Sequence, residues 1–386
     1  MNDPFFGRLL ETLTAPAAGY VRQITPPDCA RVDLGIGEAR YPLPAQLLLT
    51  IGRTSAELEN LWYTTPDGEQ ALQDAYRTQL SASESEPDLE RDSVLVTAGG
   101  KEAAWLAVRY LLYRGRAAVA VVPSPGWEPY RLWLNAAGCP HITYDPVAVA
   151  EDPTLLRQLI INSDQQPGLI ILNYPNNPTG VGVTHEAMND MVQIATDFGW
   201  SLLSDEVYRV FGVADVSAVH APARDPYRHL VIDSCSKALT VAGLRVGFLV
   251  AHRSVVEELS AFRASYASCT SVLNQRIATA LLTDSAVQAW LASVRVTVER
   301  DRIATVKALT EYGIEVTSHG GLYIWSRTPD RSMLPPLAGL DHPPAALITS
   351  GAGFGASDHF RLCTARADLD PAGAAAAVVT TLRRQR

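Results

Sequence analysis

Lysine is scarce in this chain, and one lysine stands where chemistry is expected. Of 32 basic residues, three are lysines: Lys101, Lys237 and Lys307. The apolar run that ends at Asp233 predicts a strand, and Lys237 follows it in a serine-containing turn, eight positions before Arg245. A lysine amine can condense with an aldehyde, and Ser234, Ser236 and Arg245 are residue types that bind phosphate. A surface lysine at a turn is the alternative, although the chain otherwise uses arginine for its cations.

Three other loops combine the end of an apolar run with residues that could bind a charged ligand. Asn177 lies in a proline-containing turn after one run, and Asp205 directly ends another. A desolvated carboxylate at a strand end is costly unless a cation or a strong donor pairs with it. Gly99 and Gly100 break a third run just before a helical pattern, where backbone N–H groups can bind an anion. Ordinary turns and helix caps are the alternative for each loop taken alone.

Short apolar runs alternate with amphipathic stretches in the middle of the chain. Runs with the length and the β-branched content of strands lie at 93–97, 117–122, 140–144, 169–172, 200–204, 229–233 and 246–250. Helical patterns lie between most of them, for example at 101–113 and 185–198. This alternation predicts an α/β domain whose mostly parallel, seven-stranded sheet is packed between helices. Such sheets bind ligands at the carboxyl ends of their strands, which is where the four loops occur.

The pattern changes after about residue 252 and predicts a second, smaller α+β domain. The expected elements are helices at 254–266 and 274–309 (broken near Asp284), strands at 313–318 and 320–326, a proline-rich surface loop at 328–344 and a helix at 371–384. The expected parts are an N-terminal arm packing with the small domain (1–39), a large domain (40–265) and a small C-terminal domain (266–386).

Composition and charge narrow the possible classes of function. The 386 residues carry a formal net charge of −9, which argues against a general nucleic-acid-binding surface. No stretch approaches the roughly 18 uninterrupted apolar residues of a membrane span, and the charged residues Asp3, Arg8 and Glu11 do not fit a signal peptide. Five widely spaced cysteines are expected to be free thiols of a cytoplasmic protein. The histidines show no pairing, so no metal site is expected.

Together the four loops resemble those of the fold type I pyridoxal-phosphate enzymes, in the class I/II aminotransferase family. A glycine loop, Asn-Asn-Pro-Thr-Gly, Ser-Asp-Glu-x-Tyr, Ser-x-x-Lys and Gly-Leu-Arg-x-Gly follow one another in the family's order. The spacing agrees as well, with 28 positions from Asn177 to Asp205 and 32 from there to Lys237. The resemblance extends from about Asp33 to Arg361. The N-terminal half looks most like the succinyldiaminopimelate aminotransferases.

The resemblance implies pyridoxal 5′-phosphate as the cofactor and suggests roles for single residues. Lys237 would form a Schiff base with it, with Lys101 as the second candidate amine. Asp205 would pair with the pyridinium nitrogen and keep it protonated. Asn177 and Tyr208 would donate hydrogen bonds to the phenolic oxygen. The residues expected around the phosphate are Gly99, Gly100, Lys101, Ser234, Ser236 and Arg245.

Further matches concern the substrate and a second subunit. Trp127 corresponds to the aromatic residue that stacks on the cofactor ring. Tyr63 corresponds to the tyrosine that reaches the phosphate of the neighbouring subunit, which implies a homodimer with shared active sites. Arg361 and Gly37 correspond to the contacts of the substrate α-carboxylate. Arg40 departs from the family's Gly-Glu-Pro pattern, and is expected either to face the substrate side chain or to be solvated on a loop.

The resemblance implies an aminotransferase that moves an amino group from an α-amino acid to a 2-oxo acid. Between Tyr323 and Arg361 the chain is shorter than is usual in the family and rich in proline. A non-transaminating enzyme of the same fold, such as a cyclase, eliminase or oxidase, is therefore the alternative. A regulatory relative with a DNA-binding domain is disfavoured, because the arm before Asp33 is short and carries no basic cluster.

Overall fold

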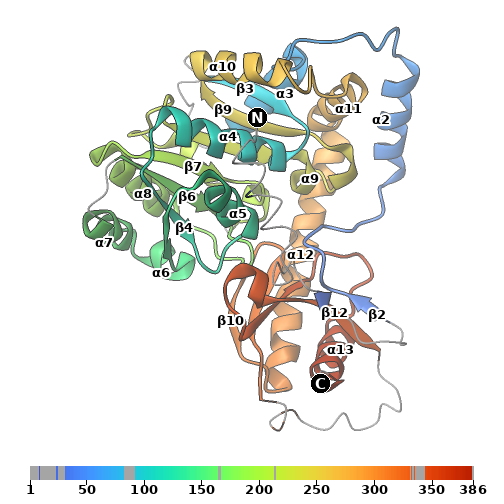
Figure 1. Ribbon diagram of the computed structural model, residues 1–386. Helices are drawn as coiled ribbons and strands as arrows, with labels where there is room; N and C mark the ends of the chain where they lie inside the picture. The colour runs from blue at the N-terminus through green and yellow to red at the C-terminus, as the bar shows by residue number, and fades with distance from the viewer. Residues whose placement is uncertain are drawn as a thin grey trace.

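The protein consists of two lobes joined by the long helix α12 (Ser285–Glu311), as the computed structural model shows (Figure 1). The structure describes residues 8, 23–24, 31–81, 92–163, 167–212, 214–330, 332, 334 and 344–384. One lobe contains a large sheet with helices on both faces, and the other contains a smaller sheet and the C-terminus. Most of the expected proline-rich loop at 328–344 lies outside the described residues.

Within the described residues the large sheet has seven strands, and all but β9 run parallel. Their order across the sheet is β3-β9-β8-β7-β6-β4-β5, with β9 antiparallel to both of its neighbours. The strands are β3 (Asp92–Thr97), β4 (Val119–Pro123), β5 (His141–Tyr144), β6 (Gly168–Asn173), β7 (Ser201–Asp205), β8 (His229–Ser234) and β9 (Gly247–His252). The predicted α/β class with a mostly parallel sheet is confirmed.

Successive residues of a strand belong to cores on opposite faces of the sheet. Ile170 and Leu172 of β6 pack into one core, and Leu169 and Ile171 into the other. One face is covered by α4 (Gly100–Arg114), α5 (Glu128–Ala137) and α10 (Arg253–Ala264). The other is covered by α2 (Ala45–Ala56), α3 (Gln70–Ser81), α6 (Pro146–Glu151), α7 (Thr154–Ser163), α8 (His185–Asp197) and α11 (Val272–Thr283). Burial on both faces explains why these strands appear as continuous apolar runs.

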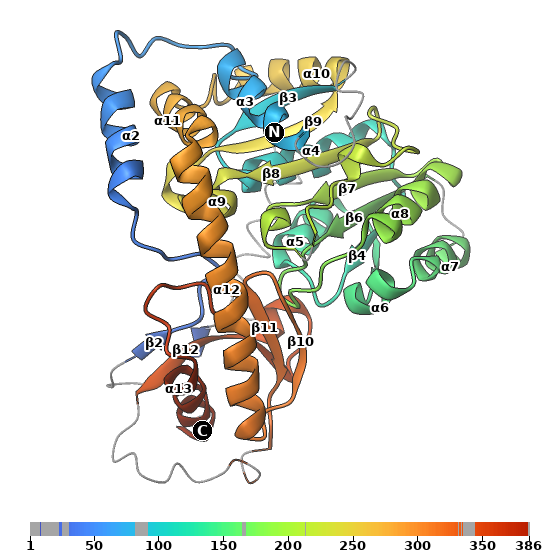
Figure 2. The same ribbon diagram turned by 180° about the vertical axis from the view of Figure 1, so that it is seen from behind.

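The helical region after α10 breaks at Asp284, as predicted. The Asp284 carboxylate accepts hydrogen bonds from the N–H groups of Ala286 (2.9 Å) and Val287 (3.2 Å), and so caps α12. α11 and α12 meet at an angle of 77°. No single helix of the described residues is long and apolar enough to cross a membrane; α11 and α12 pass that test only as a bent pair. Figure 2 shows α12 running from the large lobe into the small one.

Six strands of the described residues form the sheet of the small lobe. Five follow the order β1-β12-β13-β11-β10, and β2 pairs in parallel with β12. They are β1 (Gln23–Ile24), β2 (Arg31–Asp33), β10 (Val316–Gly320), β11 (Tyr323–Arg327), β12 (Ala345–Ser350) and β13 (His359–Cys363). The short turn η5 (Gly351–Phe354) and the helix α13 (Pro371–Arg384) complete the lobe. Leu34 packs in its core.

The change from one core to the other occurs later in the chain than the expected boundary at residue 265. Ile277 and Leu281 of α11 and Leu291 of α12 pack in the core of the large lobe. Leu309, near the end of α12, packs in the core of the small lobe. α11 and the first turns of α12 therefore belong to the large lobe by packing. An amphipathic pattern predicts a buried helix face but does not say which lobe buries it.

The buried hydroxyl of Thr381 fastens α13 to β12, and this contact can be tested. It accepts a hydrogen bond from the N–H of Ala346 (2.7 Å), whereas the buried hydroxyl of Thr380 donates to the Ala376 carbonyl of its own helix (2.8 Å). Thr381→Val should lower the free energy of unfolding by about 1–3 kcal/mol, because a buried N–H loses its acceptor. Thr380→Val should cost less than about 0.5 kcal/mol. Urea denaturation measures both, and equal losses would contradict this assignment.

Candidate active site

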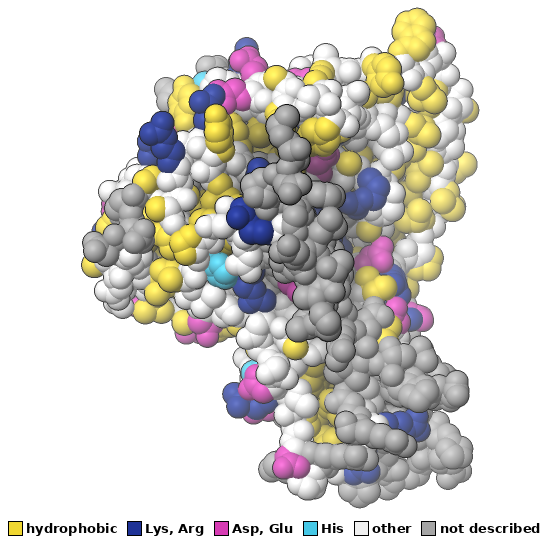
Figure 3. Space-filling model, viewed as in Figure 1, with side chains coloured by type: hydrophobic (Ala, Val, Ile, Leu, Met, Phe, Trp, Pro, Cys, Tyr) yellow, Lys and Arg dark blue, Asp and Glu magenta, His cyan; other side chains and the backbone are white. Residues whose placement is uncertain are grey.

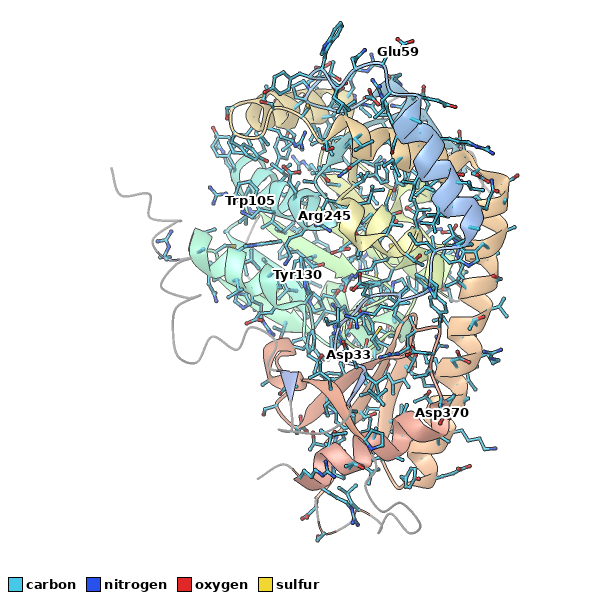
Figure 4. All side chains as sticks on the ribbon, turned by 90° about the vertical axis from the view of Figure 1, so that its right-hand side faces the viewer. Asp33, Glu59, Trp105, Tyr130, Arg245 and Asp370 are labelled. Carbon is cyan, nitrogen blue, oxygen red and sulfur yellow. The ribbon has the colours of Figure 1, made fainter. Side chains whose placement is uncertain are left out.

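A cavity of about 490 Å³ lies where the carboxyl ends of the large sheet meet the small lobe. The strand ends of β6, β7 and β8 provide Asn173, Asp205 and Ser234, and the small lobe provides Tyr323, Phe354 and Arg361. Figure 4 shows Tyr130 and Arg245 in the large lobe, with Asp33 below them toward the small lobe. The parallel strands therefore present their ends to one shared space, as expected for this type of sheet.

Most of the predicted site residues come together in this cavity. Its lining includes Gly37, Gly100, Lys101, Trp127, Asn177, Asp205, Tyr208, Ser234, Ser236, Lys237, Arg245 and Arg361. Gly99 lies against Arg245, because a Cβ built on Gly99 would be 2.4 Å from Nη2 of that arginine. Tyr63 and Arg40 are not among the lining residues.

Arg40 is held away from the cavity by neighbouring carboxylates. Its guanidinium pairs with Asp33 (2.6 Å) and Glu38 (3.5 Å). The expectation that Arg40 faces a substrate is therefore not met, and its solvated alternative fits the structure better. Tyr63 is 87% exposed, so its side chain contacts little of its own chain.

Lys237 is held on the single-turn helix α9 (Cys235–Ala238), which begins where β8 ends. Ser234 caps this turn, since its Oγ accepts a hydrogen bond from the N–H of Ser236 (3.1 Å). The Nζ of Lys237 donates to the carbonyl of Gly37, which also lines the cavity. Burial lowers the pKa of the Lys237 amine. A larger share of the amine is therefore neutral and nucleophilic near neutral pH.

Hydrogen-bond donors gather where α4 begins. The first N–H groups of a helix have no partner within it, and Gly99 precedes them at a φ of +88° that favours glycine. The Arg245 guanidinium donates to the carbonyls of Ala98 (3.2 Å) and Ala242 (3.0 Å) and lies 3.4 Å from the Ser236 hydroxyl. None of these partners is a carboxylate. The helix start and Arg245 together can therefore bind an anion such as a phosphate.

The carboxylate of Asp205 is buried at the end of β7, with 4% of the residue exposed. The Tyr130 hydroxyl donates to Oδ2, and the N–H of Val207 donates to Oδ1 (3.3 Å). Burial raises the pKa of Asp205 to about 6, while these two hydrogen bonds act in the opposite direction. Both donors are neutral, so no cation of the described part of the chain is hydrogen-bonded to this carboxylate. A cationic group bound in the cavity could therefore pair with the Asp205 carboxylate and would lower its pKa.

Asn177 and Tyr208 connect the large lobe to the small one. The Nδ2 of Asn177 donates to the Tyr208 hydroxyl (3.5 Å), and its Oδ1 accepts from Nη1 of Arg361 (2.7 Å). The hydroxyls of Tyr208 and Tyr323 are hydrogen-bonded at 2.7 Å. Burial raises the pKa of Tyr208 to about 12, so its hydroxyl keeps its proton near neutral pH. This pair can donate to an anionic oxygen in the cavity.

The guanidinium of Arg361 is buried without being fully paired. Its Nη2 donates to the Gly35 carbonyl (2.6 Å) and lies 3.4 Å from the Thr349 hydroxyl, but its Nε has no hydrogen-bond partner in the described part of the chain. The rings of Tyr323 and Phe354 have centroids 4.6 and 5.0 Å from its Cζ. A desolvated guanidinium with an unused donor is suited to a planar carboxylate.

Lys101 and Trp127 form the wall between α4 and α5. The Nζ of Lys101 is 5.5 Å from the centroid of the Trp127 ring. Burial and the nearby Arg245 lower the pKa of the Lys101 amine. Trp127 packs edge-on against Tyr130 and Trp133, with ring centroids 5.1 and 5.5 Å away. These contacts hold the indole as a flat apolar wall of the cavity.

Sequence reasoning missed several residues of the cavity. Asn173 ends a strand as Asp205 does, and its Nδ2 donates to the Asp205 carbonyl (3.1 Å), so its strand-end position was a usable signal. Tyr130 follows Trp127 by three positions, which is the spacing of neighbours on a helix surface. The aromatic residues of the small lobe that line the cavity, Tyr323 and Phe354, carry no such signal, because only the packing of the lobes brings them here.

The side chains of the cavity fit pyridoxal 5′-phosphate, the cofactor that the resemblance implies. Lys237 provides a desolvated amine, and Asp205 provides a buried carboxylate whose hydrogen-bond partners are neutral. Arg245 and the start of α4 provide an anion site, and Trp127 provides a flat wall. The Nε of Arg361, which has no hydrogen-bond partner in the described residues, is free to bind a carboxylate on a second molecule, the substrate.

Known proteins with similar sequences are aminotransferases. The sequence model of "Aminotransferase class I and II" matches residues 31–378. An aspartate aminotransferase of Pyrococcus horikoshii is 28% identical over 60% of this chain, and the match spans 59% of that relative. L-glutamine--4-(methylsulfanyl)-2-oxobutanoate aminotransferase of Bacillus subtilis is 27% identical over 78% of this chain and 75% of its own length. LL-diaminopimelate aminotransferase of Dehalococcoides mccartyi is 25% identical over 84% of both chains.

Solved structures show the same fold. A double mutant of the Thermus thermophilus aspartate aminotransferase has a TM-score of 0.77 at 20% identity, covering 100% of this chain and 97% of its own. The aromatic aminotransferase of Pyrococcus horikoshii has a TM-score of 0.74 at 21% identity, covering 92% of this chain and 95% of its own. Since the family match extends over both lobes and the cavity between them, the chain belongs to the class I and II aminotransferase family, whose members depend on pyridoxal 5′-phosphate.

Proposed function

We propose that the protein is an aminotransferase that moves an amino group from an α-amino acid to a 2-oxo acid. One observation carries the proposal: the amine of Lys237 and the incompletely paired guanidinium of Arg361 line the same cavity. An amino acid whose carboxylate is bound by Arg361 would have its amino group and α-carbon in the space that Lys237 also lines. The aminotransferases among the relatives support this reaction class.

Each part of the cofactor has residues that would hold it. They are Gly99, Gly100, Lys101, Ser234, Ser236 and Arg245 for the phosphate, Asp205 for the ring nitrogen, Asn177 and Tyr208 for the phenolic oxygen, and Trp127 for the ring face. When bound, the cofactor supplies an aldehyde and an electron-withdrawing ring that stabilises negative charge at the substrate α-carbon.

The remaining chemistry belongs to side chains of this protein. When neutral, the amine of Lys237 can anchor an aldehyde and, as a base, can take the proton from the substrate α-carbon and later return it. Its lowered pKa favours that role. Arg361 and the backbone of Gly37 would bind the α-carboxylate. A Cβ on Gly37 would clash with the Tyr323 hydroxyl, so a side chain at this position would require that ring to move.

We also propose a homodimer in which each subunit completes the site of the other. Tyr63 resembles a phosphate-binding residue, yet it is 87% exposed and does not line the cavity of its own chain. Trp62 is 78% exposed, and Figure 3 shows hydrophobic side chains gathered over α2 and the segment after it. Exposed apolar residues of this patch are Leu48, Leu49, Leu61, Trp62 and Tyr63. An exposed apolar patch of this kind is typical of a subunit interface.

We further propose that the enzyme acts in the cytoplasm, and that its partners are a small-molecule amino acid and a 2-oxo acid. The described cysteines, Cys139, Cys235, Cys269 and Cys363, are free thiols, as is usual in a reducing compartment. No group of three or more side chains able to hold a metal ion occurs among the described residues.

The proposed reaction is tested first at Lys237. The purified enzyme should absorb in the visible range, and Lys237→Ala should lose the covalent attachment. Borohydride reduction and peptide mapping should place the pyridoxyl label on Lys237, and the matched control Lys101→Ala should keep that label. With an amino acid alone, the released cofactor should be the pyridoxamine form by mass spectrometry. A label on Lys101 or Lys307, or product formed while the cofactor stays an aldehyde, would overturn the proposal.

The role of Arg361 gives a second prediction. Charge-assisted hydrogen bonds in a desolvated site are costly to lose, so Arg361→Ala should lower kcat/KM for an α-amino acid by roughly 30-fold or more. Arg361→Lys should recover little of this, because an ammonium lacks the planar fork. The visible absorbance should stay the same, since Arg361 is not among the residues assigned to the cofactor. A primary amine without a carboxylate serves as the control substrate. Equal losses for both substrates would make Arg361 structural.

The shared site is tested by mixing two inactive variants. Tyr63→Ala and Lys237→Ala should each have low activity alone. After subunit exchange, half of the dimers carry one variant of each kind, and one of their two sites has both residues intact. Activity should therefore rise to about a quarter of the wild-type value. No recovery despite exchange measured by native mass spectrometry, or a fully active monomer in sedimentation, would contradict the homodimer.

A further inference from the structure

We propose that Arg131 is a positioning residue for substrate binding, which fastens the small-lobe turn η5 to α5 of the large lobe and so keeps Phe354 against Arg361. The inference rests on the proposed function, because Arg361 is taken as the carboxylate-binding group. It concerns a residue outside the cavity lining, which neither the sequence patterns nor the family resemblance singled out.

Within the described residues, three hydrogen bonds cross from the large lobe to η5. The Nη2 of Arg131 donates to the Gly353 carbonyl (3.0 Å), and Nη1 donates to the Phe354 carbonyl (3.3 Å). The N–H of Gly126 donates to the same Phe354 carbonyl (3.1 Å). Both acceptors are backbone carbonyls, and that of Phe354 accepts two of the three bonds, so these contacts fix the path of the turn itself. An arginine can do this because its planar fork places two donors at once.

The contact is also tight, as the next residue shows. Gly355 has a φ of +95°, and a Cβ built on it would lie 2.5 Å from Nη1 of Arg131 and 2.9 Å from the Ser124 hydroxyl. A side chain at this position would force the guanidinium away from the turn. Glycine therefore permits the close approach on which the two Arg131 hydrogen bonds depend.

Phe354 connects the turn η5 to the proposed carboxylate-binding group, Arg361. It is 1% exposed, lines the cavity, and has its ring centroid 5.0 Å from Cζ of Arg361. The Tyr323 ring also packs near that guanidinium, at 4.6 Å. Water is thereby kept from the guanidinium, and a carboxylate bound there interacts more strongly than it would in a solvated site. Releasing η5 would admit water to Arg361 and weaken carboxylate binding.

The large-lobe side of this contact is itself anchored. Arg131 follows Tyr130, whose hydroxyl is bonded to the buried Asp205 carboxylate, and the same helix begins after Trp127. α5 is therefore fixed to the cofactor side of the cavity independently of η5. Loss of the Arg131 guanidinium should free the turn and leave the cofactor residues in place.

The experiment compares Arg131→Met with the wild-type holoenzyme. Methionine keeps an apolar stem and removes both donors. KM for the α-amino acid should rise by roughly 5- to 20-fold, whereas kcat should change by less than about threefold, because binding rather than proton transfer is affected. Hydrogen exchange of the backbone amides in 350–356 should become faster. Exchange in 233–239 and the affinity for pyridoxal 5′-phosphate should stay unchanged.

Two further variants make the test specific. Arg131→Lys retains one donor nitrogen in place of two and should give an intermediate KM and an intermediate rate of exchange. This variant also tests the inference if Arg131→Met does not fold. Arg228→Met is the matched control, because Arg228 also donates to a backbone carbonyl, that of Gly199 (2.8 Å), but within the large lobe. It should leave both KM and exchange in 350–356 unchanged.

The outcomes separate this inference from the proposed function. Unchanged exchange in 350–356, or an unchanged KM with faster exchange, would overturn the role of Arg131. Loss of cofactor affinity together with faster exchange in 233–239 would also overturn it, since the residue would then support the fold. For an amine without a carboxylate, KM should change little, and an equal rise would count against the inference. If the wild-type enzyme shows no transamination at all, the proposed function fails, while the exchange measurement still tests the contact.

Discussion

A buried carboxylate at the end of β7 is the constraint on which the rest of the cavity depends. Asp205 remains ionisable near neutral pH because donors are held against it, and the Tyr130 hydroxyl is one of them. Tyr130 in turn fixes the helix that begins after Trp127. Asn173 of the neighbouring strand β6 donates from its Nδ2 to the Asp205 carbonyl (3.1 Å), and its Oδ1 accepts from the N–H of Asn177 (2.9 Å). The aromatic wall and the asparagine loop are thus both tied to one strand end.

A second buried network lies beside this carboxylate and joins two loops of the cavity. Arg209 directly follows Tyr208, and Asp233 directly precedes Ser234. Their side chains pair at 3.3 Å, and both residues are less than 5% exposed. The Asp233 carboxylate also accepts a hydrogen bond from the N–H of Ser234 (2.6 Å). Since buried ion pairs contribute little net stability, what this pair determines is the position of the Tyr208 loop relative to the turn that carries Lys237.

The parts of the fold and site that the sequence predicts are those set by local pattern. The central strands appear as apolar runs, and residues at their ends, such as Lys237 and Asp205, must meet at one edge of a parallel sheet. Contacts between the lobes have no such signal, so the place of Phe354 over the cavity and the packing of α11 could not be predicted. Arg40 does not line the cavity for a local reason: its guanidinium pairs with the nearby carboxylates of Asp33 and Glu38.

The continuous helix between the lobes limits how the cavity can open. Leu291 of α12 packs in one core and Leu309 in the other, about 27 Å further along at 1.5 Å per residue. A continuous helix, and not a flexible loop, therefore connects the two lobes at this point. Bending it by about 5° would displace the far end by about 2 Å, and helices accept gentle curvature of this kind more readily than a sharp kink. A helix of this kind therefore favours small elastic openings of the cavity, about as wide as a water molecule.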